Sequence, residues 1–322
     1  MTDSVSAPWL TGVFAPVPDE IDAYDLQVEG ALPPELTGRY FRNGPNPAPG
    51  DTSAHWFLGD GMAHGVRLRE GRAEWYRNRW VRTTRFTEGA SLVRRDGAFD
   101  RAAVSANTHV MAHAGRIMAL VESGFPYELT PELETVGWHD FGGRLTTAMT
   151  AHPKRDPRTG ELLFFGYGFA PPCLTYHRLS AAGELVESRV VEVGGPTMMH
   201  DFAITERYVV WLDLPVVFDL ELRSGMPYRW DSDYPARLGV MPRAGGPVRW
   251  FDIDPCYVFH IGNAYEDAEG RIVLDAVRYA PDDFTALWSD IGGGGDTSGG
   301  TGAGRLHRWV LDIATGRVTA FR

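Results

Sequence analysis

The sequence predicts an all-β protein built as a β-propeller. Glycine and proline are abundant, with 37 and 22 copies in 322 residues, and this surplus over an average protein favours many turns and few long helices. A turn glycine followed by Arg or Glu recurs before β-rich runs, at Gly71, Gly115, Gly160, Gly183, Gly270 and Gly316. Their successive intervals are 44, 45, 23, 87 and 46 residues, and a period of about 40 to 50 is typical of a four-stranded propeller blade. A β-sandwich with evenly spaced hairpins is the alternative.

The expected elements follow the chain as a single domain over residues 1–322. Residues 1–50 are rich in proline and predict an extended N-terminal strap. Each recurrent glycine then predicts the turn of a β-hairpin, because glycine adopts the backbone conformations that tight turns require. Helix is scarce, and 131–136 is the best candidate for a short one. The glycine-rich stretch 292–304 predicts a surface loop.

Composition excludes several classes of protein. The formal net charge is −11 and the pI about 5.4, which argues against a nucleic-acid partner because phosphate binding needs clustered cations. The chain has no apolar run long enough for a membrane helix, and acidic residues stand at 19, 20 and 22, where a secretory signal would need a basic and apolar start. Cys173 and Cys256 are too far apart for a zinc knuckle and fit a reducing compartment. We therefore expect a cytoplasmic protein, and any metal must use ligands other than cysteine.

Three histidines stand in unusual local contexts. His152 lies in Thr-Ala-His-Pro-Lys, His200 in Met-Met-His-Asp-Phe and His260 in Val-Phe-His-Ile-Gly. Their separations of 48 and 60 residues are each about one blade, and equivalent positions of successive blades converge on a propeller axis. Imidazoles gathered there would suit iron, copper, nickel or zinc. For each histidine alone, the alternative is a hydrogen-bonded core or turn residue. The local signatures of serine hydrolases, P-loop proteins and zincins are absent.

Seven segments, in order along nearly the whole chain, carry a family resemblance. They are residues 42–47, 56–66, 106–110, 113–129, 151–162, 199–208 and 259–266, among them Arg-Asn-Gly-Pro-Asn-Pro, Trp-Phe-Leu-Gly-Asp-Gly-Met-Ala-His-Gly-Val and Phe-His-Ile-Gly-Asn-Ala-Tyr-Glu. With them the sequence resembles the carotenoid cleavage oxygenases, a family that includes apocarotenoid oxygenases, lignostilbene dioxygenases and retinoid isomerases. The resemblance implies a seven-bladed propeller with a cap of loops and short helices.

The resemblance also implies a site, namely one non-haem Fe(2+) per chain held by four histidines. His152, His200 and His260 match the first three ligands, and Glu122 matches one of three glutamates that accept a proton from a ligand imidazole. A carboxylate on the far ring nitrogen fixes the orientation of the ring and makes it a better donor. The fourth ligand and two glutamates of the family lie beyond the end of this chain, and His307 stands in an ordinary strand context. We therefore expect a C-terminally truncated member with an incomplete propeller that binds iron weakly.

The function implied is a dioxygenase that uses O2 to cleave a conjugated double bond of a carotenoid or apocarotenoid into two carbonyl products. Lignostilbene-cleaving members have a lysine for the substrate phenol where this chain has Val121, so a stilbenoid substrate is the alternative. The sequence is also compatible with a non-catalytic propeller that serves as a binding module, with an inactive fragment and with a calcium-dependent propeller lactonase.

A lipid-derived substrate also implies peripheral contact with the inner face of a bacterial membrane. We expect an apolar entrance that includes Leu214, Val216, Val217 and Phe218, with Val121 as a further candidate. A buried strand and its loop is the alternative for 214–218.

Overall fold

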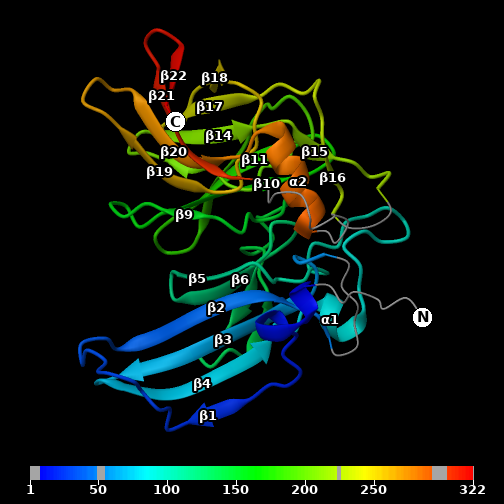
Figure 1. Ribbon diagram of the computed structural model, residues 1–322, viewed down its shortest axis with the longest axis vertical. Helices are drawn as coiled ribbons and strands as arrows, with labels where there is room; N and C mark the ends of the chain where they lie inside the picture. The colour runs from blue at the N-terminus through cyan, green and yellow to red at the C-terminus, as the bar shows by residue number, and fades with distance from the viewer. Residues whose placement is uncertain (1–7, 49–54, 223–225, 292–302, 322) are drawn as a thin grey trace. The chain divides into compact units, whose positions relative to one another are not determined.

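The computed structural model describes residues 8–48, 55–222, 226–291 and 303–321. Contacts divide the chain into two compact units. Unit 1 comprises Met1–Ala151 with Ala181–Leu185, and unit 2 comprises His152–Ser180 with Val186–Arg322. Figure 1 shows that both are built almost wholly from β-strands. The predicted all-β class is confirmed, while the single domain over 1–322 stays a prediction.

Unit 1 holds two four-stranded antiparallel sheets. The first has the order β1-β4-β3-β2, with β1 Asp22–Tyr24, β2 Gly38–Asn46, β3 Asp60–Arg69 and β4 Arg72–Trp80. The second follows chain order, with β5 His109–His113, β6 Arg116–Leu120, β7 Tyr127–Leu129 and β8 Thr135–Trp138. Short helical turns accompany them, namely η1 Pro8–Leu10, η2 Gly12–Phe14 and α1 Thr84–Glu88. The core of this unit gathers residues from both sheets, including Ala63, Ala119 and Tyr127.

Unit 2 repeats the same design three times, with four-stranded antiparallel sheets that each begin at an edge strand. The first is built from β9 Lys154–Arg155, β10 Leu162–Tyr167, β11 Leu174–Leu179 and β12 Leu185–Val190. The second is built from β13 Ala203–Ile204, β14 Tyr208–Asp213, β17 Arg237–Pro242 and β18 Arg249–Asp252. The third is built from β19 Ile261–Glu266, β20 Ile272–Arg278, β21 Arg305–Asp312 and β22 Arg317–Phe321. A two-stranded ribbon, β15 Val216–Phe218 with β16 Tyr228–Trp230, and the helix α2 Pro281–Ile291 complete it.

The recurrent glycines occupy the turns that the sequence predicts. Each lies between two paired antiparallel strands, and the six φ values run from 73° at Gly160 to 82° at Gly183. This left-handed conformation is open to glycine at little cost and is strained for most other residues. The local signal therefore locates real hairpins, and the four-stranded sheets that they join match the predicted blades.

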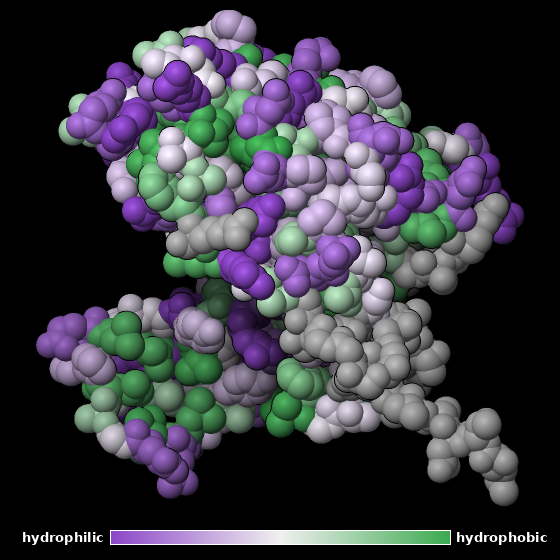
Figure 2. Space-filling model, turned by 45° about the horizontal axis from the view of Figure 1, so that its top comes forward, coloured by the Kyte–Doolittle hydropathy of each residue, from purple (hydrophilic) through white to green (hydrophobic). Residues whose placement is uncertain are grey.

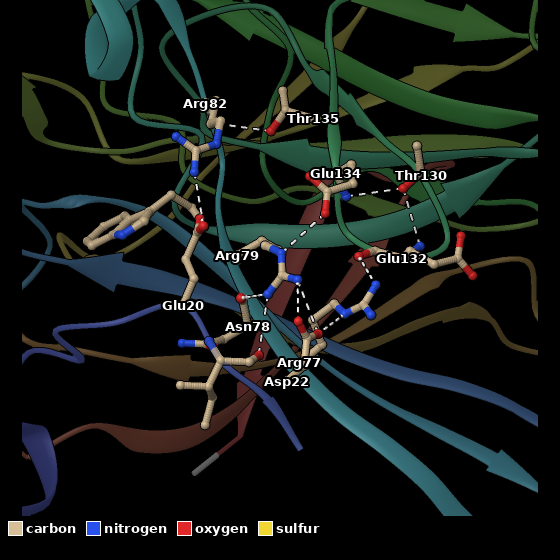
Figure 3. Close-up of polar contacts among 12 residues, drawn as sticks. Glu20, Asp22, Arg77, Asn78, Arg79, Arg82, Thr130, Glu132, Glu134 and Thr135 are labelled. Atoms are coloured by element: carbon tan, nitrogen blue, oxygen red, sulfur yellow. Dashed lines mark hydrogen bonds and ion pairs between the residues drawn. The ribbon is translucent and has the colours of Figure 1, made fainter. Parts of the chain in front are cut away.

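An ion-pair ladder joins the two sheets of unit 1 (Figure 3). Arg77 and Arg79 are two residues apart on β4, so both side chains lie on the same face of the strand. Both guanidinium groups contact Asp22. The hydrogen bond from Arg79 lowers the pKa of this carboxyl. Arg79 also contacts Glu134 Oε1 at 3.2 Å, and Arg82 donates its backbone N–H to Thr135 Oγ1 at 2.9 Å. The ladder thus fixes the start of β8 against β4.

Two local predictions need correction or completion. The stretch 131–136 is not helical, because Leu133 is buried in a left-handed turn with φ 70° and β8 starts at Thr135. The helix α2 was not predicted, although it begins with Pro281 and two aspartates in its first turn, a usual N-terminal pattern. The predicted loop 292–304 lies outside the described residues except for its last two positions.

Large hydrophobic side chains are exposed in both units, among them Val13, Leu220 and Leu222. Hydrophobic groups stand among hydrophilic ones on the face drawn in Figure 2. No helix among the described residues has the length and apolar character needed to cross a membrane.

Candidate metal centre

Three histidines of unit 2 occupy the same place in three successive sheets. His152 stands two residues before β9, His200 three residues before β13 and His260 directly before β19. Each strand is the first of its sheet in chain order and forms one edge of it. The repeated position explains how residues 48 and 60 apart in the chain meet at one point.

The ring nitrogens of these histidines converge. His152 Nε2 lies 2.9 Å from His200 Nε2, and His200 Nε2 lies 3.3 Å from His260 Nε2. The three ligand atoms all fall within 4.8 Å of one another, and the described residues hold no other group of three or more potential metal ligands. Imidazole nitrogens bound about 2.0–2.1 Å from a metal ion stand roughly 3 Å apart when they subtend a right angle. The donor set and its spacing therefore fit a transition-metal ion.

The cluster is open on one side and aromatic on another. His152 and His200 are half-buried, whereas His260 is exposed. The ring of Phe259 meets His200 edge-on at 5.9 Å. Two aromatic residues of α2 stack near-parallel on Phe259, with Phe284 at 6.0 Å and Trp288 at 6.1 Å between ring centroids. This unpredicted helix therefore packs against the aromatic ring that lies beside His200.

A buried carboxylate stands next to the cluster in the chain. Asp201 follows His200 directly, is only 2% exposed, and contacts Lys154 Nζ at 2.6 Å. Asp201 was not among the predicted site residues, and its only signal in the sequence is an acidic side chain between a candidate ligand and an apolar run.

The other predicted site residues lie elsewhere. Val121 and Glu122 directly follow β6 in unit 1 and are half-buried, and their predicted roles stay predictions. His307 lies in β21 and packs its ring against Trp309 at 4.3 Å, apart from the three-histidine cluster.

The predicted apolar entrance over 214–218 needs correction. Leu214, Val216 and Val217 are at most 4% exposed. Leu214 and Val216 belong to the core of unit 2, and the half-buried Phe218 packs against that core. The segment is therefore a buried strand with its loop.

Comparison with known proteins gives concordant relationships. Residues 14–321 match the family described as retinal pigment epithelial membrane protein. A protein of Mycobacterium tuberculosis named carotenoid cleavage oxygenase is 42% identical, over 97% of this chain and 72% of that relative. The crystal structure of the lignostilbene dioxygenase of Pseudomonas brassicacearum is similar with a TM-score of 0.82 and 31% identity, over 97% of this chain and 70% of that one.

A structure of the Synechocystis apocarotenoid oxygenase is similar with a TM-score of 0.76 and 26% identity, over 95% of this chain and 70% of that one. The match of the family over almost all of the described residues agrees with the blade-like sheets and the three convergent histidines. The chain belongs to the retinal pigment epithelial membrane protein family, the family of the carotenoid cleavage oxygenases.

Proposed function

We propose that this protein is a dioxygenase that binds one Fe(2+) at His152, His200 and His260 and cleaves a conjugated double bond of a carotenoid or apocarotenoid. One C=C bond and one O2 give two C=O groups, so each product receives one oxygen atom and no external reductant is consumed. The convergence of three Nε2 atoms in unit 2 is the observation that carries the proposal. Membership of a family with oxygenases among its named relatives supports the reaction class.

The proposed reaction with O2 requires a redox-active metal. Three neutral imidazoles suit iron, cobalt, nickel, copper and zinc, but zinc has no accessible redox chemistry. When bound, Fe(2+) would supply the activation of O2. The histidines would hold the ion while leaving its charge uncompensated, since the cluster contains no carboxylate ligand among the described residues. Glu122 would then orient one imidazole, as the family resemblance implies.

The surroundings favour an apolar substrate. Phe259 lies beside His200 and His260, and the half-buried Trp288 stacks on Phe259. Aromatic surface of this kind can orient a polyene and exclude water from it.

The alternative substrate is a stilbenoid, in line with the similarity to a lignostilbene dioxygenase. Its phenol would require a polar partner, but position 121 holds a valine that packs against the apolar core of unit 1. The chain's one lysine, Lys154, is ion-paired with Asp201 at 2.6 Å. These contacts favour the carotenoid class.

Peripheral contact with a membrane is also part of the proposal, because a carotenoid partitions into lipid. With the 214–218 segment buried, the exposed leucines that follow it are better candidates. Leu220 is 57% exposed and Leu222 is 44% exposed, and both lie next to the ribbon β15–β16. Two leucines of this kind can enter the interfacial region of a bilayer.

The test compares three forms of the 322-residue chain after loading with Fe(2+) without O2. Iron content, O2 uptake and carbonyl products are measured with an apocarotenoid aldehyde and, in parallel, with resveratrol. We expect the unaltered chain to bind one iron and to form two carbonyl fragments from the apocarotenoid. His200→Ala removes the central ligand and should abolish both iron binding and product.

His177→Phe is the matched control, because it removes a histidine of the same unit that lies outside the cluster, and it should retain both properties. If resveratrol is cleaved and the apocarotenoid is not, the result supports the stilbenoid alternative. Equal product from His200→Ala would refute the ligand assignment, and an iron-free, inactive unaltered chain would favour a non-catalytic role.

A further inference from the structure

Asp201 contacts the chain segments of all three clustered histidines. Its Oδ1 accepts a hydrogen bond from the adjacent backbone N–H of Phe202 at 2.8 Å and lies 2.6 Å from Lys154 Nζ, two residues after His152. Its Oδ2 accepts from the backbone N–H of Ile261 at 2.9 Å, directly after His260. Asp201 itself directly follows His200. One carboxylate therefore links the three places from which the imidazoles project.

The hydrogen bonds of Asp201 are charge-assisted and buried. Asp201 is 2% exposed, and charge-assisted hydrogen bonds gain strength where water is excluded. Lys154 is 28% exposed at its side chain and lies 5.9 Å from the ring of Phe202, so its position is also restrained. A buried carboxylate deprived of such partners is costly, which favours the single arrangement that satisfies both oxygens.

The histidines need a restraint of this type. Each precedes the first strand of its sheet, so none lies within the hydrogen-bonded ladders that hold the sheets together. A second buried contact acts in the same sense, since Tyr257 Oη donates to the backbone carbonyl of Met198 at 3.0 Å. It joins the segments before His260 and before His200, but it does not reach His152.

We propose that Asp201 is a positioning residue that sets the spacing of His152, His200 and His260, and that Lys154 is its partner in this role. The inference rests on the proposed metal centre and adds to it residues that touch no metal. Loss of the carboxylate should let the three segments separate, so that a metal ion meets a looser set of imidazoles. Partners that orient ligands in this way are typically worth 10–100-fold in metal affinity.

The test titrates the 322-residue chain with Co²⁺, whose visible absorption reports the ligand geometry directly. Asp201→Asn preserves size, but its amide NH2 must face either the Lys154 ammonium or the Ile261 N–H. We expect its Kd for Co²⁺ to rise by about 10–100-fold with an altered spectrum. Lys154→Met should also raise the Kd for Co²⁺, whereas Lys154→Arg, which keeps the positive charge, should retain most of the affinity of the unaltered chain. The urea midpoint of each metal-free variant is measured in parallel.

Asp213→Asn is the matched control. Asp213 is a fully buried aspartate of unit 2 that accepts from Arg237 Nε at 2.7 Å and from Tyr234 Oη at 2.6 Å, and it is not adjacent to a clustered histidine. The Asp213→Asn variant should have a lower urea midpoint but an unchanged Co²⁺ spectrum and an unchanged Kd for Co²⁺.

The proposal is overturned if Asp201→Asn binds Co²⁺ as the unaltered chain does, or if Asp213→Asn weakens binding equally. If Asp201→Asn does not fold, the contrast between Lys154→Met and Lys154→Arg decides, and equal Kd values for these two would overturn it. Failure of the unaltered chain to bind Co²⁺ would instead remove the metal centre itself, and the positioning role with it.

Discussion

Replacing His177 by phenylalanine should remove an acid-sensitive contribution to the stability of unit 2. His177 lies on β11, is 1% exposed, and stacks on Phe164 of the neighbouring strand at 4.9 Å between ring centroids. Its Nδ1 is 2.8 Å from Ser188 Oγ. Burial lowers the pKa of His177 from 6.5 to about 4, because the charged imidazolium loses hydration in the core.

The sign and size of the effect follow from this pKa. The unfolded chain takes up the proton near pH 6.5 and the folded chain only near pH 4. The stabilising contribution of neutral His177 is therefore fully present above pH 6.5 and is lost as the pH falls toward 4. One pKa unit corresponds to about 1.4 kcal/mol, so the full loss is ~3 kcal/mol. Most of this loss of stability, ~2 kcal/mol, has occurred when the pH reaches 5.

Urea unfolding at pH 7.5 and pH 5.0, followed by tryptophan fluorescence, measures this directly. His177→Phe keeps the ring stack and loses the hydrogen bond to the exposed Ser188, which costs about 0.5–1.5 kcal/mol at pH 7.5. Between the two pH values the unaltered chain should lose ~2 kcal/mol more than the variant, since titrating carboxylates act on both equally. Ser188→Ala should keep the pH sensitivity of the unaltered chain, because burial and not the hydroxyl is its cause. Equal pH dependence of the unaltered chain and His177→Phe would refute this explanation.

Two further predictions concern packing and lipid contact. A Cβ added at Gly239 on β17 would lie 2.5 Å from Trp250 Cζ3, so Gly239→Ala should lower the free energy of unfolding by about 1–3 kcal/mol, and an unchanged urea midpoint would contradict the close approach. Replacing both Leu220 and Leu222 by serine should reduce cosedimentation with phosphatidylcholine vesicles roughly tenfold, since burying a leucine is worth about 1.5–3 kcal/mol and these two are half-exposed. Val13→Ser, at an exposed position in unit 1, is the control. Equal losses of vesicle binding in both variants would refute a specific contact.

The hairpins could be predicted from the sequence because their signal is local. Gly115 and Gly270 are followed at once by an arginine and a β-rich run, and the left-handed conformation they supply is fixed by the turn itself. The 131–136 stretch shows the limit of such local signals. Leu133 ends in a buried turn, and the packing of unit 1 overrides a weak helical preference.

The site was predictable in part. The contexts of His152, His200 and His260 marked them as candidates, and the family resemblance grouped them. The role of Asp201 depends on partners 47 residues before it and 60 residues after it in the chain, and no local pattern marks such a contact. Buried Val216 and exposed Leu220 likewise differ by their place relative to the ribbon β15–β16, which hydrophobicity alone does not reveal.

The unequal spacing of the histidines has a structural cause that supports their equivalence. The 48 residues from His152 to His200 contain one plain sheet, β9 to β12. The 60 residues from His200 to His260 contain the next sheet with the ribbon β15–β16 inserted between β14 and β17. This sheet also lacks a recurrent glycine, because its first turn passes through Thr205 and Arg207, and the 87-residue interval between Gly183 and Gly270 spans it. An insertion in the interior of a sheet lengthens the chain without moving the residue that precedes its first strand. Ligand positions are therefore equivalent by their place before that strand, and the sequence interval only approximates it.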